Sequence, residues 1–171
     1  KSALNYFNFS SGNPSIDNIN HVGFYQFSKN FKKTNKSAMS LQTGRRVIAV
    51  FTGTYSEFAG VPGYDNPDNF CNNFYEGVSF IQENLHQIPN AELHIRWHPN
   101  SKNLKGNERD KLVNIIERGR QINNVHHISP ESNFNTYDLI YAADNCIGFG
   151  TSVSIEACLY GKPTIFIGNN I

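Results

Sequence analysis

Five short runs rich in apolar residues, each separated from the next by a segment with helical spacing, restrict the fold of this chain more than any other feature. They lie at 47–51, 93–97, 125–128, 146–149 and 164–167. The first is apolar throughout, as expected of a strand buried on both faces. The alternation predicts an α/β fold, a parallel sheet with helices on both faces. Right-handed crossovers favour the strand order 3-2-1-4-5.

Four helices are expected between these strands. Apolar residues at three- and four-residue spacing mark the first two, within 74–85 and 112–116. A third could begin with a cap at Thr136 and run to Ala143. The fourth is expected to end at Gly161 and to face the sheet with an apolar stripe, formed by Ile155, Cys158 and Leu159.

The composition suits one globular domain with a hydrophobic core. Of 171 residues, 39% are hydrophobic and 17% are charged, and the formal net charge is +1. These values argue against general disorder and against a surface that coats nucleic acid, so we expect no nucleic-acid partner. The cysteines lack the spacing of metal ligands and are expected to be free thiols in a reducing cytosol; they are Cys71, Cys146 and Cys158.

Residues 1–44 differ from the rest of the chain, because they are rich in Asn and Ser and have neither strand nor helix periodicity. The chain begins with Lys1 rather than Met, so we expect a piece of a longer protein. We interpret 1–44 as a linker or the tail of a preceding domain, and 45–171 as a separate domain. Four lysines of the first segment could contact anionic lipid or substrate, or could face solvent; these are Lys29, Lys32, Lys33 and Lys36. No signal peptide is evident, and no apolar run approaches the roughly 20 residues of a membrane span.

In an open parallel sheet, ligands bind beyond the carboxyl ends of the strands, where the strand order reverses. Here this point lies between the first and fourth strands. The first strand is followed by Thr52-Gly53-Thr54, and the fourth leads into Phe149-Gly150-Thr151-Ser152. Gly150 would let the main chain approach a phosphate, and Thr151 and Ser152 would add hydroxyls to the free N–H groups of the next helix. The same two hydroxyls could instead only cap that helix.

His98 and Glu156 are further candidates for this crevice. Pro99 ends the second strand and holds His98 extended, so its imidazole could donate to a phosphate or could simply lie at the surface. Glu156, early in the last helix, could accept hydrogen bonds from ribose hydroxyls or could only stabilise the helix dipole.

No metal site is expected. His94, His126 and His127 lack the spacing and the acidic partners of a zinc site. Arg96 lies on the same strand face as His98, and a buried arginine usually forms a structural ion pair.

The stretch 52–73 is a long loop with no evident structure of its own. Loops of this length in compact domains are usually functional. Its Glu57 lies just past the first strand, and we take it as the candidate for acidic contact with a sugar and for a catalytic role.

Three segments resemble the C-terminal domain of GT-B glycosyltransferases, namely Tyr137–Asp144, Ile147–Ala157 and Tyr160–Pro163. Together with Ile95–Asn100, they are similar to the capsule polysaccharide biosynthesis proteins, including Kdo-transferase-like and sialyltransferase-like enzymes. The resemblance spans about residues 46–169 and implies that 45–171 is a Rossmann-like domain, the C-terminal half of a GT-B enzyme. Its substrate would be a nucleotide sugar, a CMP-sugar in these enzymes, and no cofactor is implied.

The resemblance also implies a role for each candidate. His98 and Thr151-Ser152 would contact the nucleotide phosphate from opposite sides, and Glu156 would bind the ribose. The residues after the third strand that would meet the base are Ser129, Pro130 and Ser132. These families often carry Gly-Ser-Thr or Ser-Ser/Thr where this chain has Gly-Thr-Ser, so the hydroxyls stand in swapped order.

In such enzymes the catalytic base lies in the N-terminal domain, so the present chain is expected to bind the donor without transferring the sugar. A glycan or glycolipid acceptor would be reached through that missing domain. The resemblance implies a bacterial, cytoplasmic glycosyltransferase, with peripheral association at the inner face of the membrane left open. The alternatives are a UDP-sugar 2-epimerase, a glycerophosphotransferase and a non-catalytic nucleotide-binding module.

Overall fold

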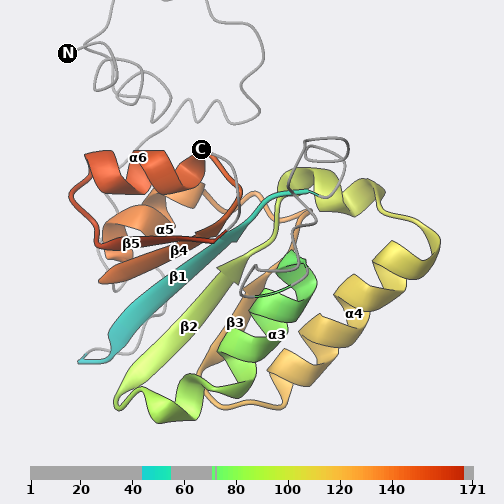
Figure 1. Cartoon of the computed structure of the whole chain (residues 1–171), viewed down its shortest axis with the longest axis horizontal. Helices are drawn as coiled ribbons and strands as arrows, with labels where there is room; N and C mark the ends of the chain where they lie inside the picture. The colour runs from blue at the N-terminus through green and yellow to red at the C-terminus, as the bar shows by residue number, and fades with distance from the viewer. Residues whose placement is uncertain (1–43, 55–70, 72, 168–171) are drawn as a thin grey trace, which may run out of the picture.

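The computed structural model describes residues 44–54, 71 and 73–167, and in this part of the chain the five predicted strands form one sheet (Figure 1). The strands are β1 (Arg46–Thr52), β2 (Ala91–Arg96), β3 (Val125–Ile128), β4 (Asn145–Phe149) and β5 (Thr164–Ile167). Their order is β3-β2-β1-β4-β5, and every neighbouring pair is parallel. Both the parallel α/β fold and the strand order are therefore confirmed.

Two pairs of helices cover the two faces of the sheet (Figure 1). The helices α3 (Phe74–Glu83) and α4 (Gly106–Arg120) lie on one face, and α5 (Thr136–Ala142) and α6 (Val153–Leu159) lie on the other. Short 3-10 helices follow α3 and β2, namely η2 (Leu85–Gln87) and η3 (Pro99–Asn103). The described residues thus have the helices on both faces that the sequence predicts.

The side chains of β1 divide the core into two layers. Ile48 and Val50 pack with α3 and α4, whereas Val47, Ala49 and Phe51 pack with α5 and α6. All five are buried, because successive side chains of a strand point to opposite faces and both faces are covered. This double burial explains why the segment is apolar throughout.

The start of α5 differs from the prediction that Thr136 is its cap. Asn135 occupies the cap position, and its side-chain oxygen accepts a hydrogen bond of 2.9 Å from the main-chain N–H of Tyr137. Thr136 is the first helical residue and is buried. Asn is at least as good an N-cap as Thr, so the more exposed amide takes the position.

The predicted inner stripe of α6 is wrong. Ile155 and Leu159 are 43% and 36% exposed, Cys158 is exposed as well, and the buried residues are Ser154, Glu156 and Ala157. The reason is the close approach of this helix to β4, where a Cβ added to Gly148 would collide with the Ser154 hydroxyl. At this point of contact only a small side chain such as that of Ser154 fits, and the larger apolar residues Ile155 and Leu159 point outward. Gly161 ends the helix as predicted, with a left-handed φ of +71°.

Some predictions lie outside the described residues. These are the nature of residues 1–43, with their lysines, and the position of Glu57. The division of the chain near residue 44 likewise stays a prediction. The three cysteines are free thiols. Among the described helices, none is both long and apolar enough to cross a membrane.

Candidate functional site

The loops that follow β1 and β4 lie side by side where the strand order reverses. Thr52 is paired with Phe149 in the register of the two strands, and the Gly53 N–H donates to the Phe149 carbonyl at 3.0 Å. Thr52 and Thr54 are both buried, with exposed fractions of 2% and 3%. The two hydroxyl- and glycine-containing segments therefore start at adjacent positions, as the crevice prediction requires.

Gly150 has a backbone conformation that suits glycine. Its φ is +53°, in the left-handed region, and its N–H donates to the Ile167 carbonyl at 3.1 Å. The turn thus links the end of β4 to the end of β5. Gly150 has a structural role here whether or not the turn also contacts a ligand.

The two hydroxyls after Gly150 cap α6 only weakly. Ser152 is at the N-cap position and makes no side-chain cap hydrogen bond, and it is exposed. The Thr151 hydroxyl accepts a long hydrogen bond of 3.4 Å from the Val153 N–H. Since α6 has only seven residues, any anion bound here would depend mainly on nearby N–H and hydroxyl donors and less on the helix dipole.

His98 is held at the carboxyl end of β2 by hydrogen bonds on both sides. Its main-chain N–H donates to the Thr52 hydroxyl at 3.0 Å, which connects it to the end of β1. Its Nδ1 accepts from the Asn100 N–H at 3.2 Å, so the side chain is the N-cap of η3, with Pro99 as the first residue. In the neutral ring this bond places the proton on Nε2, which is then a hydrogen-bond donor.

Glu156 is more deeply buried than a residue that only stabilises a helix dipole needs to be. It is 7% exposed, and burial raises the pKa of its carboxyl group, an effect that a hydrogen bond with Tyr137 of α5 partly offsets. The side chain therefore connects α6 to α5. A role toward ribose would require a ligand that reaches this buried carboxylate.

The segment expected to meet the base is positioned by Arg96. The guanidinium donates to the main-chain carbonyls of Ser129 at 2.5 Å and Ser132 at 3.2 Å. Arg96 is buried, with a pKa lowered by desolvation, but its partners in the described chain are these carbonyls and not a carboxylate. Instead of the predicted ion pair, Arg96 forms hydrogen bonds that hold the loop after β3. In that loop Ser129 is exposed and bonded to the Glu131 carboxylate, and Pro130 is buried.

Of the three histidines on β2 and β3, His127 contacts Trp97, whereas His94 and His126 lie against each other. His127 accepts a hydrogen bond of 3.0 Å from the Trp97 indole, and burial lowers its pKa to about 4, so it is neutral near pH 7. His94 lies 3.3 Å from the Glu92 carboxylate and stacks on His126. The sequence prediction that these histidines lack an acidic partner is therefore wrong for His94, because strand alternation places Glu92 beside it.

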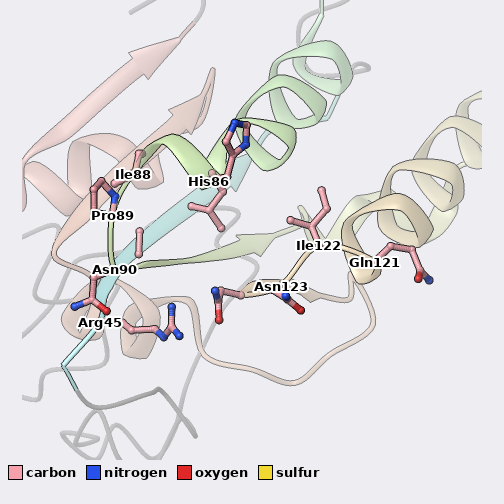
Figure 2. A pocket seen from close by; sticks show the side chains of 11 residues that line it. Arg45, His86, Ile88, Pro89, Asn90, Gln121, Ile122 and Asn123 are labelled. Atoms are coloured by element: carbon pink, nitrogen blue, oxygen red, sulfur yellow. The ribbon is translucent and has the colours of Figure 1, made fainter.

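One cavity lined by described residues lies away from the predicted crevice. It has a volume of about 520 Å³ and lies at the amino ends of β1 and β2 (Figure 2). Arg45, His86, Pro89 and Asn90 are among the residues that line it. Ligands of parallel sheets bind at the opposite, carboxyl end, so this cavity gives no support to a nucleotide site.

Taken together, the described residues form an open, doubly wound parallel sheet of the Rossmann-like class, with the candidate residues Gly53, Thr54, His98 and Gly150–Ser152 at its carboxyl edge. No family model and no curated protein matches the chain. Its fold is similar to that of a solved structure, the β-Kdo 2,4-transferase KpsC of Thermosulfurimonas dismutans. The TM-score is 0.54 at 15% identity, over 98% of this chain and 43% of that chain.

A second solved structure, the β-Kdo 2,7-transferase KpsC of the same organism, matches with a TM-score of 0.48 at 18% identity, over 75% of this chain and 35% of that one. The chain spans less than half the length of either transferase. The likeness to the 2,4-transferase confirms the predicted Rossmann-like fold and, at the level of the fold, the resemblance to Kdo-transferase-like proteins.

Proposed function

We propose that this chain is the donor-binding half of a glycosyltransferase of surface polysaccharide synthesis, with a nucleotide sugar, a CMP-sugar, as its substrate. The proposal rests on the meeting of the β1 and β4 loops at the point where the strand order reverses, with His98 tied to the same point through Thr52. The fold likeness to a protein described as a Kdo transferase agrees with this assignment.

The phosphate of the nucleotide would lie between His98 and the Gly150–Ser152 turn. With its proton on Nε2, the imidazole of His98 would donate to the phosphate, and Ser152 would add an exposed hydroxyl that makes no cap hydrogen bond. Gly53 and Thr54 would line the floor of the same crevice. A hydrogen bond to a charged phosphate contributes about 1.5–3 kcal/mol, so a few such donors suffice for micromolar affinity.

The nucleoside would extend toward β2 and β3. The loop held by Arg96, which includes Ser129, Pro130 and Ser132, offers polar main-chain groups for recognition of a base. Glu156 would accept hydrogen bonds from the ribose, at the energetic cost of keeping its buried carboxyl group ionised.

The rest of the enzyme would be supplied by a further domain. We propose that such a domain brings the catalytic base and the glycan or glycolipid acceptor, because the chain spans 43% of the transferase whose fold it shares. In this proposal the protein is cytoplasmic and works without a cofactor in sugar transfer, and residues 1–44 link it to the preceding domain. Glu57 remains a candidate for contact with the sugar.

Calorimetric titration of the purified chain with CMP, CDP, UDP and GDP tests the proposal. A preference for the cytidine nucleotides supports a capsule-type transferase. A preference for UDP would replace it with a UDP-sugar enzyme such as a 2-epimerase. Absence of binding to all four nucleotides would contradict a donor site in the chain by itself.

A further inference from the structure

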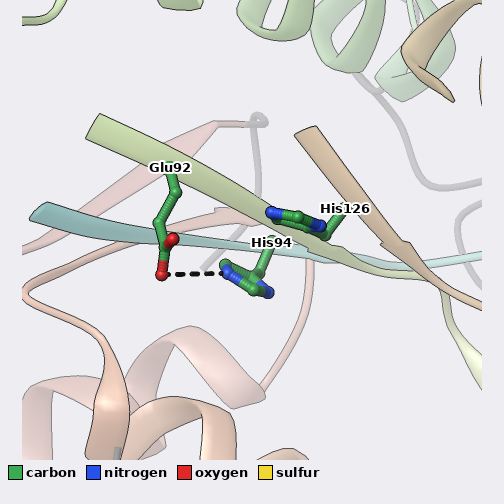
Figure 3. Close-up of side chains that lie close together, drawn as sticks. All are labelled: Glu92, His94 and His126. Atoms are coloured by element: carbon green, nitrogen blue, oxygen red, sulfur yellow. Dashed lines mark hydrogen bonds and ion pairs between the residues drawn. The ribbon is translucent and has the colours of Figure 1, made fainter. Parts of the chain in front are cut away.

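The side chains of Glu92, His94 and His126 form a cluster (Figure 3). Glu92 and His94 are two residues apart on β2, so they share one face of the sheet. His126 of β3 is the direct register partner of His94. Two neighbouring strands thus bring one carboxylate and two imidazoles together, although His126 is far from the other two residues in the sequence.

We propose that these three side chains bind one divalent transition-metal ion, Zn²⁺ being the ion they suit best. One donor atom from each residue lies within 4.8 Å of the others. Two imidazoles and one carboxylate are a common ligand set for zinc, whereas Mg²⁺ and Ca²⁺ prefer oxygen ligands alone.

The distances within the cluster fit this assignment. Two ligands at about 2.0–2.1 Å from a tetrahedral zinc ion are about 3.3 Å apart. The Glu92 Oε1 and the His94 Nε2 are separated by 3.3 Å. His126 is exposed, so a rotation of its side chain can bring a ring nitrogen into the same sphere, and solvent can supply the fourth ligand.

The buried part of the cluster explains why the ion would bind in a defined place. Glu92 and His94 are 1% and 8% exposed, and they alternate along β2 with Leu93 and Ile95, which point to the opposite face. Their side chains therefore have little freedom to lose when the metal binds, which favours affinity. His126 closes the site from the solvent side.

The site would stabilise the sheet and leave nucleotide binding unchanged. Glu92 pairs in register with Val47, near the amino end of β1, whereas the proposed crevice lies past the carboxyl end at Thr52. A zinc ion would link β2 to β3 with three coordination bonds, two to β2 and one to β3. It would raise the melting temperature, because it binds the folded chain in preference to the unfolded one.

The test is calorimetric titration of the chelator-treated protein with ZnCl₂, together with its melting temperature. We expect one zinc ion per chain, a higher melting temperature with zinc, and no competition from a hundredfold excess of MgCl₂. His126→Ala should weaken zinc binding at least tenfold, about the lower bound for loss of a residue that supports a metal ligand. Its position is exposed, so the variant should fold, which its circular dichroism spectrum would verify.

Two further variants complete the experiment. Glu92→Gln keeps the shape of the side chain and removes its charge, so it too should lose zinc affinity. His86→Ala is the matched control, because His86 is an exposed histidine of η2 outside the cluster, and it should bind zinc as the unmodified protein does. The proposal would be overturned if the protein bound no zinc. It would also be overturned if His126→Ala kept the full zinc affinity, or if His86→Ala lost as much affinity as His126→Ala.

Discussion

The main-chain N–H of His98 donates a hydrogen bond to the hydroxyl oxygen of Thr52, with 3.0 Å between the two atoms. The ladder between β1 and β2 ends one residue earlier on the first strand, at the pair Phe51 and Arg96. The side chain of Thr52 thus continues the connection where the main chains separate. This bond places His98 next to the loop of β1 and makes it part of the candidate site.

Replacing Thr52 with valine should remove this connection. The side chain is 2% exposed and valine has nearly the same shape, so the main effect is an N–H group left without its partner. Such a loss costs about 1–3 kcal/mol of unfolding free energy, measured by urea denaturation. Thr52→Ser retains the hydroxyl and should lose clearly less. Equal losses in the two variants would mean that the methyl group, and not the hydrogen bond, is the important part of Thr52.

His98→Ala should weaken binding of the preferred nucleotide by about ten- to a hundredfold, the equivalent of one charge-assisted hydrogen bond of roughly 1.5–3 kcal/mol. His98→Asn separates two roles, since asparagine can still cap η3 but cannot replace the Nε2–H donor. We expect stability near normal and affinity as low as in the alanine variant. Urea denaturation measures the stability and calorimetric titration the affinity. Full affinity in His98→Ala would leave His98 with a capping role alone.

Gly150→Ala should lose both stability and nucleotide binding. An alanine at a φ of +53° costs about 1–2 kcal/mol, and its Cβ would stand in the path of a phosphate. Gly161 provides the matched control, because its φ is +71° and it lies at the far end of α6. Gly161→Ala should lose a similar amount of stability and keep its affinity. Loss of affinity in both variants would attribute the effect to strain and not to the crevice.

Glu156→Gln should make the fold more stable at neutral pH. Burial raises the folded-state pKa of this carboxyl group above the ordinary 4.5, so the protonated form is favoured in the folded chain. The stability that this preference for the protonated form contributes is fully present below pH 4.5, and it is lost as the pH rises through the folded pKa. The gain in unfolding free energy should accordingly appear only above that pKa. In urea denaturation we expect it at pH 7.5 and not at pH 4.

The exposed Glu117 of α4 is a control for the loss of one carboxylate, and Glu117→Gln should show no comparable gain. If Glu156→Gln were less stable than the unmodified protein at pH 7.5, the prediction would be wrong. The folded chain would then stabilise the ionised carboxylate enough to offset its burial. Under the proposed function, the same variant should bind nucleotide more weakly, because a neutral amide accepts hydrogen bonds from ribose less well than a carboxylate.

The strands and their order could be predicted because each apolar run has to be buried and parallel connections allow few arrangements. Val47–Phe51 is the clearest case, since both faces of β1 are covered. The orientation of α6 could not be predicted in this way. There the distance between helix and strand selects small residues, and a pattern of hydrophobicity does not record that distance.

The candidate site was predictable in its position and less so in its contacts. The crevice follows from the strand order, but the hydrogen bonds of His98 and Arg96 depend on how loops fold back on strand ends. The cluster at Glu92 was missed because its third member comes from the register of β2 and β3. Alternation along β2 gives the only sequence signal, a carboxylate and a histidine two residues apart.

The close approach of α6 to β4 has an evolutionary consequence. A Cβ at Gly148 would collide with the side chain of Ser154. Residue 148 can therefore gain a side chain only if residue 154 loses its own. Ser154 is fully buried, and its hydroxyl has no hydrogen-bond partner in the described chain, so alanine there should be tolerated. Descendants of a common ancestor should therefore show covariation at these two sites: where residue 148 becomes alanine, residue 154 becomes glycine, or the helix and the turn at Gly150 shift together.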